Sequence, residues 1–195
     1  MNVAVLIYHH VSELGVVAPI SVMGTAKRLQ GSDSELAVFT VARSRLSVQT
    51  VSEVILTPTW AFASVPQIDV LFVPGGVGVE RARRNNSIIE FLKRAASQAS
   101  YVVSISSGSL LLGEAGLLRN QNVCGPDYLR ERLEAYEVGQ NLSVPELRNP
   151  SGIWCAATDE SSFNLCFALV NELGGSGLAA ETAQLMGRMD EGQPI

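Results

Sequence analysis

Short runs of apolar residues alternate along the chain with longer segments in which apolar residues recur at helical spacing. The runs are continuous and rich in β-branched residues, which is typical of parallel strands covered on both faces. They predict strands at Val3–Tyr8, Leu36–Ala42, Val70–Val73, Tyr101–Ile105 and Ile153–Ala157. Between Val48 and Leu56 the apolar residues alternate, which predicts a small antiparallel extension.

The segments with helical spacing lie between and after these strands. The predicted helices are Val16–Leu29, Asn86–Ala99, Leu110–Ala115, Tyr128–Tyr136, Ser162–Leu173 and Leu178–Met186. Alternating strands and helices predict an α/β fold, a three-layer α/β/α sandwich with a mainly parallel sheet. We expect a single domain over residues 1–195, with a tail that frays after Met189.

The composition indicates a globular protein and argues against nucleic acid and membranes as its partners. Of the 195 residues, 47% are hydrophobic and 17% are charged, and the net charge is −5. Because a nucleic-acid binder needs a basic face, we expect no nucleic-acid partner. The apolar start MNVAVLIYHH is too short to span a bilayer and has no basic flank, so we expect no membrane segment and a cytoplasmic location.

The cysteines indicate neither a metal site nor a redox pair. Cys124, Cys155 and Cys166 are an odd set without C-x-x-C spacing. We therefore expect reduced thiols packed in the core, and no metal or cofactor.

Three predicted strands are followed by segments whose residues could take part in catalysis or ligand binding. His9-His10 to Glu13 follow the first strand, Pro74-Gly75-Gly76 follow the third, and Ser106-Ser107-Gly108 follow the fourth. Ligands of parallel sheets bind beyond the carboxyl ends of the strands. The last segment, between a buried strand and a helix, has the form of a nucleophile elbow with Ser106 at its tip.

These landmarks resemble the ThiJ/PfpI superfamily, which has a flavodoxin-like, class I glutamine-amidotransferase-like fold. The motifs are VLFVPGG (Val70–Gly76), SISSGSLLLGEAGLL (Ser104–Leu118) and GIWCAATDESSFNLCFALVNELGG (Gly152–Gly175). The chain is most similar to the isonitrile-hydratase branch and to the N-terminal domains of some transcription regulators. The resemblance implies a homodimer with a pocket for a small molecule near the subunit contact.

The sequence departs from the family pattern at three positions. The family's nucleophilic cysteine corresponds to Ser106, and a histidine after the next strand corresponds to Pro126. An acidic residue four positions before the proline of the first helix corresponds to Gly15, because that proline is Pro19. Cysteine chemistry therefore cannot be transferred to this chain, since a hydroxyl without an adjacent base is a poor nucleophile.

Three residues are candidates for catalysis, namely Ser106, His10 and Glu13. Ser106 either attacks with the help of a base or only positions the ligand. His10 is a possible base because histidine titrates near neutral pH, and it is alternatively a surface residue. Glu13 lies two residues before the family's acidic position at Gly15 and would reach the pocket through a shift of the loop.

Six further residues are candidates for binding the substrate. Gly75, Gly76 and Ser107 would bring backbone N–H groups close to a developing negative charge. Cys124 and Asp127 flank the position of the family histidine, and Cys124 is alternatively a core residue. Asp159, with Glu160 beside it, is either an acid–base group or a solvated loop charge and helix cap.

Two hypotheses on function follow from these residues. In the first, the chain is a small-molecule enzyme that resembles isonitrile hydratase but carries out hydration, elimination or rearrangement by acid–base and oxyanion effects. In the second, it is a non-catalytic ligand-binding or regulatory protein that keeps the pocket. A glyoxalase-like or deglycase-like activity is disfavoured because it needs the elbow thiol.

Overall fold

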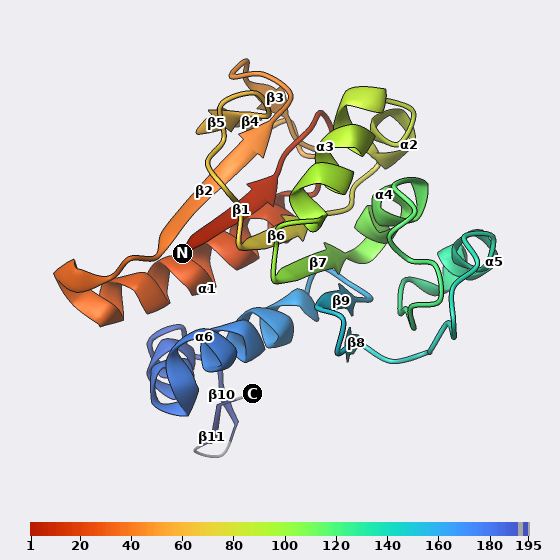
Figure 1. Cartoon of the computed structure of the whole chain (residues 1–195). Coiled ribbons are helices and arrows are strands. Elements are labelled where there is room, and N and C mark those ends of the chain that lie inside the picture. The colour runs from red at the N-terminus through yellow and green to blue at the C-terminus, as the bar shows by residue number, and fades with distance from the viewer. Residues whose placement is uncertain (191–192, 195) are drawn as a thin grey trace.

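Seven strands form a central sheet in the order β5-β2-β1-β6-β7-β9-β8 (Figure 1). The computed structural model describes residues 1–190 and 193–194. The strands are β1 Asn2–Leu6, β2 Ala37–Ala42, β5 Trp60–Ala61, β6 Val70–Val73, β7 Tyr101–Ile105, β8 Glu146–Arg148 and β9 Ile153–Ala156. All neighbouring pairs are parallel except β8 with β9. The predicted mainly parallel sheet is confirmed.

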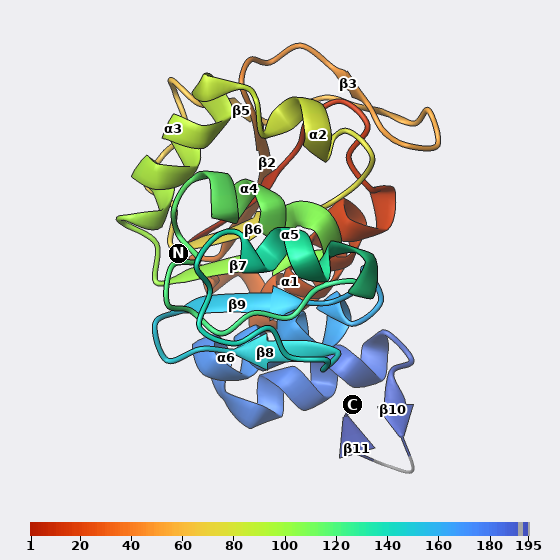
Figure 2. The same ribbon diagram turned by 90° about the vertical axis from the view of Figure 1, so that its right-hand side faces the viewer.

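Helices cover both faces of this sheet and complete the predicted three layers. Figure 1 shows α1 and α6 together on one face, and α2, α3 and α4 on the other; Figure 2 shows α5 in front of the β7–β9 region. The helices are α1 Glu13–Gln30, α2 Val79–Ala82, α3 Asn86–Ala96, α4 Ser109–Glu114, α5 Arg130–Glu134 and α6 Ser162–Leu185. Among them, α6 bends at Gly175, whose φ is 82°, so its two halves match the two helices predicted for this region.

The remaining elements are short. The strands β3 (Val48–Gln49) and β4 (Ile55–Leu56) pair antiparallel and confirm the predicted extension. The strands β10 (Met189–Asp190) and β11 (Gln193–Pro194) also pair antiparallel, and the rest of the predicted frayed tail lies outside the described residues. Single 3₁₀ turns are η1 Gly31–Asp33, η2 Ser106–Gly108 and η3 Asp127–Leu129. No helix in the described part of the chain has the length and apolarity to cross a membrane.

The elements that the sequence pattern missed are the shortest ones. The strands β5 and β8 and the helix α2 have two to four residues each, too few to carry a periodic pattern. The helix α1 starts three residues before the predicted Val16 because Ser12 caps it, accepting a hydrogen bond from the N–H of Gly15 at 3.3 Å. Asn85 caps α3 in the same way, accepting from the N–H of Ser87 at 3.0 Å.

The backbone passes unusually close to itself where β6 and β7 end. A Cβ added to Gly108 would lie 1.9 Å from the carbonyl oxygen of Val73. Only a residue without a side chain fits there, since both contacting groups belong to ordered backbone at the centre of the sheet. This contact fixes the turn after β6 against the turn after β7.

We predict that Gly108→Ala lowers the free energy of unfolding by about 3 kcal/mol or more, the upper end for an overpacked core. Gly24→Ala is the matched control, because nothing lies within 4 Å of its added Cβ in the middle of α1. That control should raise the free energy of unfolding by about 0.5–1 kcal/mol through helix propensity. Urea unfolding of the three proteins measures both, and equal stability of Gly108→Ala and wild type would contradict the tight contact.

Candidate functional site

The elbow after β7 has a strained tip. Ser106 is half-buried and has a φ of 53°, in the left-handed region that residues with a side chain rarely adopt. Such a conformation costs about 1–3 kcal/mol and persists only where the surroundings enforce it. The η2 turn and α4 follow directly, and the hydroxyl of Ser109 donates to the carbonyl oxygen of Ser106 at 3.0 Å. This is the strand–turn–helix geometry that the sequence predicts.

The glycine turn after β6 lies against this elbow. A Cβ on Gly75 would come within 2.5 Å of Ser107 Oγ. The N–H of Gly76 donates to Ser107 Oγ at 3.1 Å, and Gly76 has a φ of 124°. The structure therefore brings Gly75, Gly76 and Ser107 together. It also gives the N–H of Gly76 a partner within the protein, so this N–H is already engaged and is not free for the developing negative charge that the sequence suggested it would bind.

Asp159 reaches the same place from the turn between β9 and α6. Its Oδ2 accepts a hydrogen bond from Ser12 Oγ at 2.5 Å. Its Oδ1 is buried and has no hydrogen-bond partner among the described residues. A Cβ on Gly15 would lie 3.0 Å from this Oδ1 and 3.1 Å from the Cβ of Pro74. The carboxyl group thus stands beside the first turn of α1, where Gly15 leaves room for it.

Two residues of this neighbourhood were not found from the sequence, Tyr8 and Ser12. The Tyr8 hydroxyl donates to the carbonyl oxygen of Pro74 at 2.8 Å. Burial, and then the negative charge of Asp159, raise the pKa of Tyr8 well above its ordinary value. The only available signals were a polar tip at the end of an apolar run for Tyr8 and a helix-capping residue type for Ser12.

We call these residues together the elbow cluster. Its members are Tyr8, Ser12, Gly15, Pro74, Gly75, Gly76, Ser106, Ser107 and Asp159. They come from the carboxyl ends of β1, β6, β7 and β9 and from the start of α1, the edge at which ligands of parallel sheets bind.

His10 and Glu13, the other two catalytic candidates, lie in the segment between β1 and α1. The His10 side chain is exposed, and its carbonyl oxygen accepts a hydrogen bond from the N–H of Gly78 at 3.0 Å. The Glu13 carboxylate accepts from the N–H of Ser52, in the β3–β4 turn. The nearby Thr50 side chain and then the N–H of Ser52 hold the pKa of Glu13 below its ordinary value. Glu13 therefore ties α1 to that turn, and the catalytic roles of both residues stay predictions.

Cys124 and Asp127 make contacts outside the elbow cluster. Cys124 is fully buried, and its thiol donates to the carbonyl oxygen of Cys155 at 3.1 Å. The hydrogen bond with Cys155 and burial raise the pKa of the Cys124 thiol. The Asp127 side chain is 91% exposed and forms an ion pair with Arg130 at 3.3 Å. None of these contacts joins Cys124 or Asp127 to the elbow cluster, so their roles in substrate binding stay predictions.

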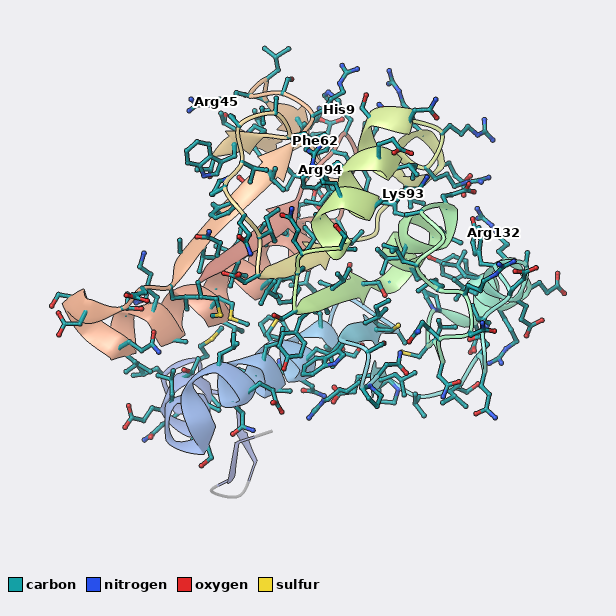
Figure 3. All side chains as sticks on the ribbon, in the orientation of Figure 1. His9, Arg45, Phe62, Lys93, Arg94 and Arg132 are labelled. Carbon is teal, nitrogen blue, oxygen red and sulfur yellow. The ribbon has the colours of Figure 1, made fainter. Side chains whose placement is uncertain are left out.

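Ser106 lines none of three cavities found among the described residues. One, of about 190 Å³, lies where β1 and β2 end and is lined by His9, which Figure 3 labels. A second, of about 420 Å³, is bordered by Phe62 and Arg94, also labelled in Figure 3. The third, of about 380 Å³, lies beside Arg148 and Trp154. Within the part of the chain that the structure describes, no three metal-ligating side chains gather.

Comparison with known proteins places this architecture. The model of the DJ-1/PfpI family matches residues 1–171. Isonitrile hydratase of Pseudomonas putida is 31% identical over 121 residues, which cover 62% of this chain and 50% of that protein. The HTH-type transcriptional regulator Rv1931c of Mycobacterium tuberculosis is 39% identical over 51 residues, which cover 26% of this chain and 20% of the regulator. The matches thus span half or less of these relatives' lengths.

A solved structure gives the same placement. The crystal structure of a ThiJ/PfpI family protein from Pseudomonas syringae superposes with a TM-score of 0.86 at 26% sequence identity. The superposition covers 100% of this chain and 77% of that chain.

We predict that Glu13→Gln destabilises the protein at neutral pH and has little effect in acid. The pKa of Glu13 is lowered from 4.5 in the fold, so its contribution to stability is complete above that value and is lost as the pH falls through the lower, folded value. Urea unfolding of wild type and variant at neutral and at acidic pH measures this difference. A gap that stays constant with pH would show that the Glu13 carboxylate is not held by the β3–β4 turn.

We predict that the native protein resists alkylation, because Cys124, Cys155 and Cys166 are all fully buried. Iodoacetamide should label the thiols only at the rate of unfolding, and unfolded protein should take up three labels. Mass spectrometry of the native and the urea-treated protein gives both numbers. Fast labelling of native Cys124 would make it a displaced nucleophile.

Proposed function

The chain belongs to the DJ-1/PfpI family, and from this premise we propose that it is a small-molecule enzyme that resembles isonitrile hydratase but works without a cysteine nucleophile. The reaction that fits the elbow cluster is a hydration by acid–base chemistry. The observation that supports it most is the carboxyl group of Asp159, whose buried Oδ1 has no partner among the described residues. An unpaired buried carboxyl oxygen is costly, and such groups concentrate at functional sites.

The place of Asp159 supports this role further. In the family pattern an acidic residue stands at the position of Gly15. In this chain Gly15 has no side chain, and Asp159 Oδ1 lies 3.0 Å from where its Cβ would be. Gly15 lacks the carboxyl group of the family pattern, and Asp159 brings one to the same place from the turn between β9 and α6. A carboxyl group is thus present beside the elbow, although the sequence position expected to carry it is empty.

Ser106 fits a positioning role better than a nucleophilic one. A serine hydroxyl attacks only when an adjacent base takes its proton. Among the described hydrogen bonds, none joins the Ser106 hydroxyl to His10, Glu13 or another base. We therefore assign to Ser106 the orientation of the ligand, and to the Ser107 hydroxyl, which accepts from the N–H of Gly76, a hydrogen bond to the ligand atom that gains negative charge.

An isonitrile is the substrate class that fits this chemistry and the similarity to isonitrile hydratase. In its neutral form the Asp159 carboxyl group would donate a proton to the isonitrile carbon, and a water molecule would then add to that carbon. The carboxylate would take back one proton from the added water, and tautomerisation would yield the formamide. The net change is the addition of one water, with Asp159 returned to its starting state.

A second candidate function is non-catalytic ligand binding in a regulator. The 51-residue similarity to an HTH-type transcriptional regulator and the absence of an elbow thiol favour it. Under either function we propose a small-molecule ligand, a homodimer and a cytoplasmic location, on the family resemblance alone.

We predict that Asp159→Asn reduces turnover of an alkyl isonitrile about 10²–10⁴-fold, the range for loss of a general acid or base. Ser106→Ala should cost only about 5- to 10-fold, the value of one hydrogen bond. Asp33→Asn is the matched control, since that aspartate is exposed on η1, outside the elbow cluster, and should leave turnover unchanged. Formamide production followed by mass spectrometry gives the three rates.

Rescue separates a chemical role of Asp159 from a structural one. In Asp159→Ala, the change Gly15→Asp places a carboxyl group at the family position, and it should restore part of the lost activity. Thermal unfolding of each variant identifies those that fold. Turnover retained by Asp159→Asn, or a covalent adduct on Ser106, would refute the mechanism. Tight isonitrile binding without turnover by the wild type would favour the regulator.

A further inference from the structure

A second recess lies beside the elbow cluster and has a different chemical character. It is the cavity of about 190 Å³ between the carboxyl ends of β1 and β2, the β2–β3 segment and the α2–α3 region. We call it the basic recess. Its charged and polar lining residues are Tyr8, His9, Arg43, Ser44, Ser47, Arg81 and Asn85. Ser106, Ser107 and Asp159 are not among its lining residues, so the mechanism proposed above does not use it.

The basic recess is lined by positively charged side chains and by no negatively charged ones. Arg43 and Arg81 line it, and no aspartate or glutamate does. Neither arginine forms an ion pair with any described carboxylate, whereas their neighbour Arg83 pairs with Glu80 and Glu114. Two guanidinium groups without a counter-charge, at the mouth of one cavity, favour an anion there.

The neighbouring polar groups suit an anion as well. The Nδ1 of His9 accepts a hydrogen bond from the N–H of Gln49 at 3.3 Å, so the proton of a neutral ring is on Nε2. The Oδ1 of Asn85 accepts from the N–H of Ser87, which leaves the Asn85 amide as a donor. The 11-residue helix α3 begins at this place without an acidic residue in its first turn. The recess therefore offers donors and no competing carboxylate.

The floor of the recess is apolar. Its buried members are Ile7, Ala42, Val48, Ala82 and Ile88. Leu46 also lines the recess and is 77% exposed, which is unusual for a leucine beside a cavity. A ligand with an apolar portion would cover Leu46 and the floor together, and this would remove that surface from water.

We propose that the basic recess binds a small organic monoanion, with a carboxylate held by Arg43 and Arg81 and a short aliphatic tail on the apolar floor. The cavity of about 190 Å³ suits a short-chain acid. A planar carboxylate also matches the fork geometry of a guanidinium. Bare phosphate would use the arginines but leave the floor unfilled.

The recess adjoins the elbow cluster at Tyr8, which lines the recess and whose hydroxyl donates to Pro74 in the cluster. A Cβ on Gly78, which lines the recess, would lie 1.9 Å from the carbonyl oxygen of His9. A Cβ on Gly76, in the elbow cluster, would lie 2.5 Å from the carbonyl oxygen of His10. The glycines of the two sites therefore contact adjacent carbonyl groups of the His9–His10 segment, but Ser106, Ser107 and Asp159 do not line the recess. A ligand in the basic recess is distinct from the substrate proposed for the elbow.

The test is a direct binding measurement, which does not depend on whether the protein turns over isonitriles. Uniformly ¹⁵N-labelled protein is titrated with hexanoate, 1-hexanol and inorganic phosphate, and amide shifts are followed by NMR. Hexanoate should bind saturably and shift the amides of residues 42–48 and 78–88. The alcohol and phosphate should each bind about tenfold or more weakly, because 1-hexanol lacks the carboxylate and phosphate lacks the aliphatic tail.

Variants at exposed arginines keep the fold and test the assignment. Arg43→Gln and Arg81→Gln should each weaken hexanoate binding about tenfold or more, through loss of a charge-assisted hydrogen bond. Arg84→Gln is the matched control, because Arg84 is exposed in the same segment but does not line the recess. Ser106→Ala should also bind hexanoate normally. Equal weakening by Arg84→Gln, equal binding of 1-hexanol, or no saturation up to about 10 mM hexanoate would overturn the proposal.

Discussion

The close backbone contact between the turn after β6 and the elbow after β7 organises this end of the molecule. Gly108 lies so near the carbonyl oxygen of Val73 that an added Cβ would be 1.9 Å from it. Because the two turns cannot separate without breaking the centre of the sheet, Ser106 is held in its left-handed conformation. The same contact places Pro74 between Tyr8 and the start of α1. The elbow cluster is thus a consequence of how two parallel strands end.

Within that frame, the residues beside the elbow differ from the family pattern while the fold is the family's. A thiol at position 106 would be partly ionised near neutral pH, whereas the hydroxyl of Ser106 is not. The arrangement keeps an acidic group, but it comes from Asp159 after β9 instead of from α1. Gly15 makes this possible, because any side chain there would press against Asp159 Oδ1 and Pro74. A site of this kind is suited to moving protons and orienting a ligand, and less suited to covalent attack.

The sequence predicted the parts of this structure that depend on local pattern. Tyr101–Ile105 has the predicted bounds, the family resemblance is confirmed, and the Ser106 elbow lies where the strand–turn–helix pattern put it. The strands β5 and β8 were missed because two or three residues carry no periodicity. The approach of Asp159 to Gly15 was not predictable from pattern, since it joins the start of the first helix to the turn before the last. The basic recess was missed for a similar reason, because its lining is assembled from the ends of several elements.

The two sites share one structural support, and this limits how either can change. Gly76 faces the carbonyl oxygen of His10, and Gly78 faces that of His9. The N–H of Gly78 also donates to the carbonyl oxygen of His10, and the N–H of Ser12 donates to the carbonyl oxygen of Gly75 at 2.9 Å. A side chain at Gly76 or Gly78 would therefore push the His9–Ser12 segment, and with it both the lining of the basic recess and the hydroxyl that holds Asp159. The glycines after β6 are required by the packing of two backbone segments, and the positions of both proposed ligand sites follow from that packing.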